Sequence, residues 1–268
     1  MAEDILLFER RGPVGLVTLN RPESMNSLNH AMFRDLLAFL ARCEEDYETR
    51  VLVLTGAGRM FCAGADLKTG PETWHPGVGS VANGLATVGA YGDVVRRLRR
   101  IPQPIIAAVN GAAAGGGFSI ALGCDMRFGS PAARFACSYV QVGLGGGEMG
   151  SSFFLPRLLG SARAADLMYT GRVVEAEEAL QMGIISRIVP AETLVDEAVA
   201  TAQSMAEKVA PFALRVTKEV LTESLNGLSL DAALKMEGRN QILASHTDDA
   251  KEARSAFLEK RPAGWRDY

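Results

Sequence analysis

Hydrophobic and polar positions in the first half of the chain follow strand and helix periods in turn. Residues 14–20 (VGLVTLN) alternate and are rich in Val, Leu and Thr, which predicts a strand. Residues 27–40 carry apolar side chains at helical spacing. The continuous apolar runs at 51–55 and 105–109 predict buried strands. Strands that alternate with helices in this way predict an α/β fold whose sheets are covered.

The last part of the chain, from about residue 191, has helical periodicity only. Proline at position 262 ends the pattern. Four amphipathic helices are predicted, at residues 193–208, 212–228, 231–245 and 248–260. A helical tail behind an α/β core is expected to pack against that core or against a neighbouring subunit.

Composition and charge narrow the function classes. The 268 residues are 48% hydrophobic and 22% charged, with a net charge of −3, which is an ordinary globular balance. Nucleic acid is not an expected partner, because phosphate neutralisation needs clustered Lys and Arg. One basic cluster exists, and the solvated face of a helix is favoured for it over a phosphate contact. It comprises Arg96, Arg97, Arg99 and Arg100.

Cysteine and histidine usage predicts a cytoplasmic protein without a metal site. The four cysteines show no CxxC pairing, so we expect reduced thiols. The three histidines form no HxxxH or HExxH array, so zinc is not expected. The N-terminus carries acids before its short apolar stretch, unlike a signal peptide, and no apolar run is long enough to span a membrane.

Two segments rich in glycine and alanine are the strongest candidates for chemistry. Residues 61–67 (FCAGADL) and 110–117 (NGAAAGGG) each follow a predicted buried strand and are expected to open a helix. Backbone N–H groups at a helix start lack intrahelical partners, so the two turns together could cradle an oxyanion. The alternatives are a tight strand-to-helix turn for the second segment and a helix start capped by Asp66 for the first. Rossmann and P-loop glycine spacings are absent.

These two segments, with several others in order, resemble the enoyl-CoA hydratase/isomerase (crotonase) superfamily. The matching stretches cover nearly the whole chain. They are NRPESMNSL at 20–28, FCAGADL at 61–67, IPQPIIAAVNGAAAGGG at 101–117, CDMRFGS at 124–130, LPRLLG at 155–160, TGRVVEAEEALQMGIISRIVP at 170–190 and FLEKRPAGW at 257–265.

The resemblance implies a spiral of ββα turns over residues 1–195, which holds the acyl-CoA site. A helical region at 196–268 would form homotrimers, often paired into hexamers. It implies an oxyanion hole made by the N–H groups of Ala63 and Gly116. It also implies no cofactor beyond the CoA moiety of the substrate. The residues that it places along the CoA path are Met25, Leu28, Ala65, Asp66 and Leu67, with Phe257 and Lys260 reaching the CoA of an adjoining subunit.

The chain departs from the hydratase pattern at both catalytic glutamates. The first stands one helical turn after the oxyanion glycine, where this chain has Ser119, and the second corresponds to Tyr139. A serine cannot act as an unaided base, and tyrosine titrates near pH 10. These positions can hold a water or donate a hydrogen bond instead.

Glu148 is the remaining candidate acid/base. It lies in the loop GLGGGEMG, which resembles the corresponding loop of dienoyl-CoA isomerases, where an acid faces the acyl chain. The alternative is a solvent-facing glutamate on a loop tip. Asp125 is expected to be a structural hydrogen-bond partner, and His75 is a weaker candidate base.

Two functions therefore remain open. The first is an enoyl-CoA hydratase/isomerase-type enzyme, hydratase by family and double-bond isomerase by its residues, in which Glu148 moves the proton. The second is a CoA-thioester-binding protein with little or no hydratase activity, because Ser119 and Tyr139 replace both glutamates.

Overall fold

The computed structural model describes residues 4–68 and 80–266. A central sheet has the strand order β1-β2-β3-β4-β6-β9, in which β1 pairs antiparallel and the other neighbours pair in parallel. A small sheet has the order β5-β7-β8. The strands of the first sheet are β1 (Leu6–Arg11), β2 (Val14–Leu19), β3 (Val51–Gly56), β4 (Ile105–Val109), β6 (Met126–Gly129) and β9 (Arg187–Ile188); those of the second are β5 (Ala112–Ala114), β7 (Arg134–Ala136) and β8 (Val174–Glu175).

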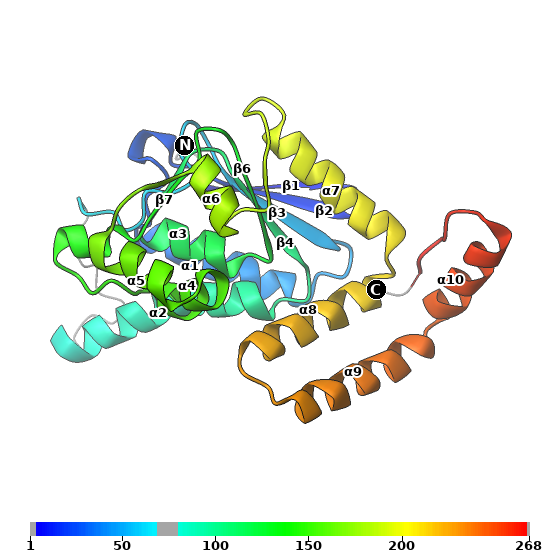
Figure 1. Cartoon of the computed structure of the whole chain (residues 1–268). Coiled ribbons are helices and arrows are strands. Elements are labelled where there is room, and N and C mark those ends of the chain that lie inside the picture. The colour runs from blue at the N-terminus through cyan, green and yellow to red at the C-terminus, as the bar shows by residue number, and fades with distance from the viewer. Residues whose placement is uncertain (1–3, 69–79, 267–268) are drawn as a thin grey trace.

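Helices cover both faces of the large sheet (Figure 1). On one face, Leu52 and Leu54 of β3 pack in an apolar core with α1 (His30–Cys43), α2 (Ser80–Arg100) and α3 (Gly116–Gly123). On the other face, Val51 and Val53 pack with α7 (Leu194–Lys208). Successive strand side chains point to opposite faces, so covering both faces requires the continuous apolar run seen in the sequence.

Shorter elements follow the small sheet. They are the 3-10 helix η2 (Ser138–Val142), α4 (Ser151–Leu159), α5 (Ser161–Thr170) and α6 (Ala176–Met182), while the 3-10 helix η1 (Pro22–Ser24) follows β2. The strands and helices expected from the periodicity are present. The α/β fold with a helical C-terminal region is confirmed, and no helix in the described ranges is long and apolar enough to cross a membrane.

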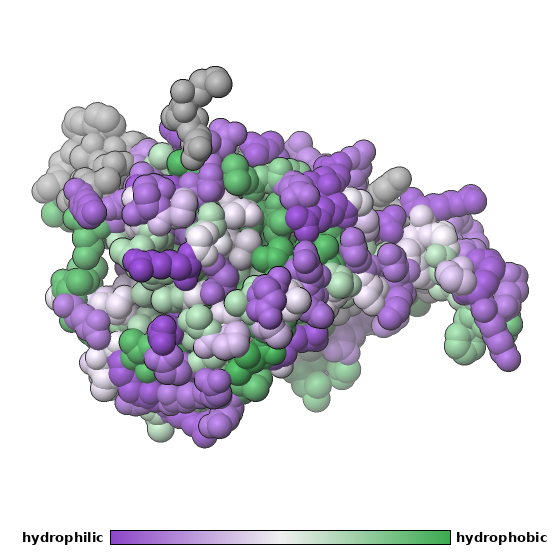
Figure 2. Space-filling view, turned by 90° about the horizontal axis from the view of Figure 1, so that it is seen from above, coloured by the Kyte–Doolittle hydropathy of each residue, from purple (hydrophilic) through white to green (hydrophobic). Residues whose placement is uncertain are grey.

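The C-terminal region leaves the body of the protein after α7. Helix α8 (Pro211–Leu225) still packs beside α2, whereas α9 (Leu230–Ser245) and α10 (Asp248–Glu259) form an arm that extends outward (Figure 1 and Figure 2). The predicted boundary at residue 195 falls inside α7, which packs on the sheet. The chain therefore continues to pack on the sheet beyond the predicted boundary, and Leu214 of α8 still belongs to the apolar cluster on that face. Apolar side chains exposed on the arm are Leu230, Leu234, Ile242, Leu243, Phe257 and Leu258.

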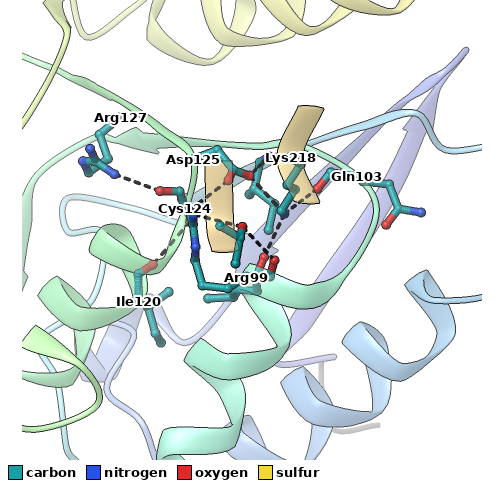
Figure 3. A network of polar contacts seen from close by, with 10 residues as sticks. Arg99, Gln103, Ile120, Cys124, Asp125, Arg127 and Lys218 are labelled. Carbon is teal, nitrogen blue, oxygen red and sulfur yellow. Dashed lines mark hydrogen bonds and ion pairs between the residues drawn. The ribbon is translucent and has the colours of Figure 1, made fainter. Parts of the chain in front are cut away.

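A buried cation ties α8 to the core (Figure 3). The Nζ of Lys218 donates to the carbonyls of Leu98 at 2.8 Å and Gln103 at 2.7 Å, and lies 3.0 Å from the Asp125 carboxylate. Asp125 also accepts hydrogen bonds from Arg99 and from the Ile105 N–H at the start of β4. As expected, Asp125 is a structural partner: it joins α2, β4 and α8.

Candidate active site

A pocket of about 130 Å³ opens between the two glycine-rich turns, α1, α2 and the loop that precedes α4. Its walls are mostly apolar. The lining residues are Leu28, Phe33, Ala63, Gly64, Ala65, Leu67, Tyr91, Gly115, Gly116, Ser138, Tyr139, Gln141, Val142, Leu144, Glu148 and Met149. The pocket thus brings together the turns at 61–67 and 110–117, as the sequence predicts, and adds Glu148.

Close backbone approach explains the glycines of the two turns. Gly64 has φ +87°, and a Cβ there would lie 2.6 Å from the Ala114 carbonyl oxygen and 3.3 Å from the Gly116 nitrogen. Only glycine adopts this backbone without strain or a clash. The first turn therefore lies against the start of α3, which begins at Gly116, inside the segment 110–117 that was predicted to open a helix.

The structure corrects the expected oxyanion donor in the first turn. The Ala63 N–H already donates to the Met25 carbonyl at 3.0 Å, so it does not point to the pocket. The N–H of Ala65, two residues later in the same turn, is oriented differently. Leu28 and Ala65 form a parallel bridge in which Leu28 donates to Gly64 and Asp66 donates to Leu28. That pattern turns the Ala65 N–H away from the bridge.

The N–H groups of Ala65 and Gly116, both in the pocket wall, have no hydrogen-bond partner among the described residues. Gly116 is the first residue of α3, where an N–H has no intrahelical acceptor and the helix dipole is positive. Each turn thus supplies a free amide at this wall, Gly116 in the second turn and Ala65, in place of Ala63, in the first.

Asp66 does not cap a helix. Its carboxylate lies 2.9 Å from Arg21 and accepts hydrogen bonds from the Ser27 hydroxyl and the Lys68 N–H. Burial acts to raise the pKa of Asp66, but these hydrogen bonds and the Arg21 charge lower it overall. Residues 67–68 form a turn, and the next helix in the described ranges is α2 (Ser80–Arg100). The ion pair fixes the first glycine-rich turn to the segment before α1.

Tyr139 lines the pocket, and the fully buried Ser119 lies behind it. The Ser119 Oγ lies 2.5 Å from the Tyr139 hydroxyl and 2.9 Å from the Glu148 carbonyl oxygen. Ser119 has one proton, so the chain of bonds runs from the Tyr139 O–H to Ser119 and from Ser119 to the Glu148 carbonyl. Burial raises the pKa of Tyr139 to about 12, so this phenol stays protonated. Both hydroxyls hold the backbone of the Glu148 loop.

Glu148 contributes the only carboxylate among the described residues that line the pocket. Its side chain is half-buried and makes no hydrogen bond or ion pair within the described ranges. Burial raises the pKa of this carboxyl above 4.5. Its N–H donates to the Ser151 Oγ at 3.1 Å, which fastens the loop to the start of α4. The backbone is therefore held from both ends while the carboxylate remains unengaged.

The other predicted residues divide between the pocket and its surroundings. Leu28 and Leu67 line the pocket with Ala65, while Met25 lies nearby and is partly exposed. Phe257 and Lys260 lie on the outward arm, away from this pocket of the same chain. His75 lies outside the described residues.

Two aromatic residues in the pocket wall were not predicted from the sequence. Phe33 of α1 and Tyr91 of α2 stack with ring centroids 3.9 Å apart. Their positions on helix faces resemble those of ordinary core residues, so the apolar periodicity alone could not distinguish them. Met149, which follows Glu148 with φ 51°, also lines the pocket.

Comparison with known proteins identifies the family. Residues 9–268 match the family model described as enoyl-CoA hydratase/isomerase. The chain belongs to this family. It is 41% identical over 263 residues to the probable enoyl-CoA hydratase echA12 of Mycobacterium leprae, covering 96% of this chain and 88% of that protein. It is 39% identical over 270 residues to the 1,2-epoxyphenylacetyl-CoA isomerase of Escherichia coli, covering 97% of each.

Solved structures of the family share the fold. A probable enoyl-CoA hydratase/isomerase from Mycobacterium abscessus superposes with a TM-score of 0.92 at 38% identity, covering 98% of this chain and 99% of that one. The enoyl-CoA hydratase of Bacillus anthracis gives a TM-score of 0.89 at 33% identity, with the same coverage. The crotonase fold expected from the sequence is thereby confirmed, and these relatives include both hydratase and isomerase names.

Proposed function

We propose that this member of the enoyl-CoA hydratase/isomerase family shifts a double bond in an unsaturated acyl-CoA, with Glu148 as the group that moves the proton. The proposal rests on which ionisable side chains line the pocket. Glu148 is the sole carboxylate among its described residues. The resemblance to hydratases predicts Ser119 and Tyr139 at the positions of the two hydratase glutamates. One carboxylate suffices to take a proton from carbon and return it.

The thioester oxygen would accept hydrogen bonds from the Ala65 and Gly116 N–H groups. Removal of a proton from C2 of a 3-enoyl-CoA by the Glu148 carboxylate sends the electron pair into a dienolate, whose negative charge resides largely on that oxygen. The glutamic acid then returns the proton to C4, which leaves the 2-enoyl-CoA. Two fixed amides stabilise the developing charge without reorganising, and such a donor typically contributes a factor of about 10²–10³ in rate.

The surroundings of Glu148 suit this role. Burial raises the pKa of its carboxyl, which makes the carboxylate a stronger base near neutral pH. No hydrogen bond among the described residues competes for its oxygens. The name of the E. coli relative, 1,2-epoxyphenylacetyl-CoA isomerase, supports an isomerisation of a CoA thioester, although of an epoxide, as the kind of reaction this chain catalyses.

Hydration is less well supported. A hydratase positions its water between two carboxylates, whereas here Ser119 and Tyr139 bond to each other and to the Glu148 carbonyl. Their hydroxyls are therefore already engaged. Addition of water would have to proceed with Glu148 as its sole carboxylate.

Product analysis in heavy water tests the reaction class directly. The protein is incubated with crotonyl-CoA, a 3-enoyl-CoA and a dienoyl-CoA, and the products are followed by mass spectrometry and NMR. We expect the 3-enoyl or dienoyl substrate to isomerise, with deuterium entering the carbon that receives the proton to the extent that the Glu148 acid exchanges with solvent before it returns the proton. Formation of 3-hydroxybutyryl-CoA at a comparable or greater rate would overturn the proposal in favour of hydration.

A second function rests on the same replacement of both glutamates. A CoA-thioester-binding protein needs the two amides and the apolar pocket but no base. It predicts tight binding of acyl-CoA with no turnover of any of the three substrates. Wild-type turnover that is lost in Glu148→Gln excludes it.

A further inference from the structure

Left-handed backbone at residues other than glycine occurs beside the first glycine-rich turn. Met25 has φ 57° and Asn26 has φ 53°, so two consecutive residues at the end of η1 adopt this conformation. A side chain in the left-handed region costs energy that the surrounding structure must offset, and such residues concentrate at functional sites. The pair is separated by one residue from Leu28, which lines the pocket. The contacts that hold this pair thus lie next to the pocket wall.

Asn26 is fully buried, and every polar atom of its side chain is used. Its Nδ2 donates both hydrogens, to the Ala57 carbonyl at 2.9 Å and to the Met60 carbonyl at 2.7 Å. Its Oδ1 accepts a hydrogen bond from the Arg21 N–H at 2.9 Å. These partners fix the amide in one orientation, because turning it would leave buried polar groups unsatisfied. The side chain thus joins the segment before α1 to the loop that follows β3.

The backbone of the same segment holds the first glycine-rich turn directly. The Met25 carbonyl accepts the Ala63 N–H at 3.0 Å, and Leu28 forms the parallel bridge with Ala65. Gly64, with φ +87°, lies between these two contacts. The turn is therefore held on both sides of its glycine, and this hold sets the direction of the Ala65 N–H.

Asn26 closes a short ring at the start of this turn. Its backbone continues into Met25, whose carbonyl holds Ala63, while its side chain holds Met60. The second glycine-rich turn holds the residues in between from the other side, since the Cys62 N–H donates to a carbonyl of that turn at 3.1 Å. A displacement of Asn26 would move both of its contacts together, and with them the rest of the first turn.

We propose that Asn26 is a positioning residue of this site, which directs the Ala65 N–H at the thioester oxygen of a bound acyl-CoA. Glycine would adopt the same backbone but could not hold Met60, and most other side chains would be strained there. Asparagine meets both requirements, because its short amide tolerates the left-handed region and bonds to nearby backbone. The inference rests on the proposed function only in taking Ala65 and Gly116 as donors to the thioester oxygen. It does not depend on which reaction follows.

Asparagine variants separate the side-chain bonds from the backbone conformation. Asn26→Asp keeps the size of the side chain but removes at least one of the two donors to Ala57 and Met60. Asn26→Gly keeps the left-handed backbone and removes the whole side chain. Asn20→Asp is the matched control, because the Asn20 Nδ2 also donates to a carbonyl, that of Asp4 at 2.9 Å, but at an exposed contact outside the ring.

The carbonyl stretch of bound butyryl-CoA, isotopically labelled at the thioester carbon, is followed by infrared difference spectroscopy for the wild type and each variant. Hydrogen bonds from both amides lower this frequency in the wild type. With one of the two donors misdirected, about half of the wild-type shift should remain in both Asn26 variants. The Kd of butyryl-CoA should rise by about 2–10-fold, whereas the Kd of free CoA, which has no thioester carbonyl, should not change. Asn20→Asp should match the wild type in every measurement.

A wild-type carbonyl shift in a folded Asn26 variant would overturn the inference. Equal weakening of CoA and butyryl-CoA would also overturn it, because Asn26 would then act on the CoA path. If Asn26→Asp does not fold, Asn26→Gly decides, and failure of both to fold would make the role of Asn26 purely structural and overturn the inference.

The same spectra distinguish failure of the inference from failure of the proposed function. A wild type that shifts the thioester carbonyl but isomerises no substrate would contradict the proposed reaction alone. A wild type that binds butyryl-CoA without any carbonyl shift would contradict the inference and the oxyanion donors together.

Discussion

The Ser119 Oγ and the Tyr139 hydroxyl lie 2.5 Å apart, and Ser119 continues the chain of hydrogen bonds to the Glu148 carbonyl oxygen. Two side chains that the sequence predicts at the positions of the hydratase glutamates thus support the backbone of an acidic residue, Glu148. Their hydroxyls bond to the backbone carbonyl of Glu148 and make no hydrogen bond to its carboxylate. This makes them positioning residues in the proposed reaction.

Tyr139→Phe tests this positioning role. Loss of one neutral hydrogen bond costs about 0.5–1.5 kcal/mol, so a several-fold fall in kcat is expected, with a KM close to that of the wild type. Ser119→Ala should act on the same bond chain, so the double variant should lose less than the two single losses combined. Steady-state kinetics of the four proteins give the coupling. Strictly additive losses would contradict a shared path through Ser119.

Glu148→Gln should lower the isomerisation rate by about 10²–10⁴-fold, because the amide cannot accept the proton. Binding of a saturated acyl-CoA should change little, since the replacement keeps the size of the side chain. Glu177→Gln, at an exposed position outside the pocket, is the control and should keep wild-type activity. A Glu148→Gln enzyme with wild-type turnover would exclude Glu148 as the base.

The raised pKa of Glu148 predicts opposite trends of activity and stability with pH. The base must be ionised, so kcat/KM should rise with pH through a pKa above the ordinary 4.5. Burial disfavours the charged form, so the stability that the neutral acid contributes is present at low pH and is lost as pH rises through the raised pKa. Denaturant unfolding of wild type and Glu148→Gln across this range measures the difference. The wild type should lose stability relative to the variant as pH increases.

The reassigned oxyanion donor can be tested at Ala65. Ala65→Pro removes the N–H and should lower kcat by about 10²–10³-fold, whereas Ala65→Gly keeps the N–H and serves as the control. The carbonyl stretch of a bound acyl thioester, followed by infrared spectroscopy, should shift less in the proline variant than in the control. An unchanged carbonyl shift, in a variant whose circular dichroism matches the wild type, would exclude this amide.

The Lys218 network predicts a stability effect at the base of α8. Lys218→Met removes a buried cation from the Asp125 carboxylate and from two carbonyl acceptors, and should destabilise the protein by about 3–5 kcal/mol. Lys208→Met, at the exposed end of α7, should change stability by less than about 0.5 kcal/mol. Thermal and denaturant unfolding measure both. A Lys218 variant as stable as the control would show that the core holds α8 without this cation.

The sequence alone determined the elements of this fold. Continuous apolar runs such as residues 105–109 can only be buried on both faces, and helical periods place α1 and α7 to α10 within a few residues of their ends. The order of motifs determined the family, and the resemblance to that family predicts that Ser119 and Tyr139 stand where a hydratase has its two glutamates. These conclusions depend only on the spacing and the types of residues that are close together in the sequence.

Only the tertiary structure decided which groups face the substrate pocket. The sequence placed Ala63 in the oxyanion hole, but its N–H meets the Met25 carbonyl, and the bridge between Leu28 and Ala65 turns the later amide toward the pocket. The free carboxylate of Glu148 and the stacking of Phe33 on Tyr91 likewise follow from segments far apart in the chain. The direction of an N–H depends on its partner across the fold, and a linear sequence does not specify that partner.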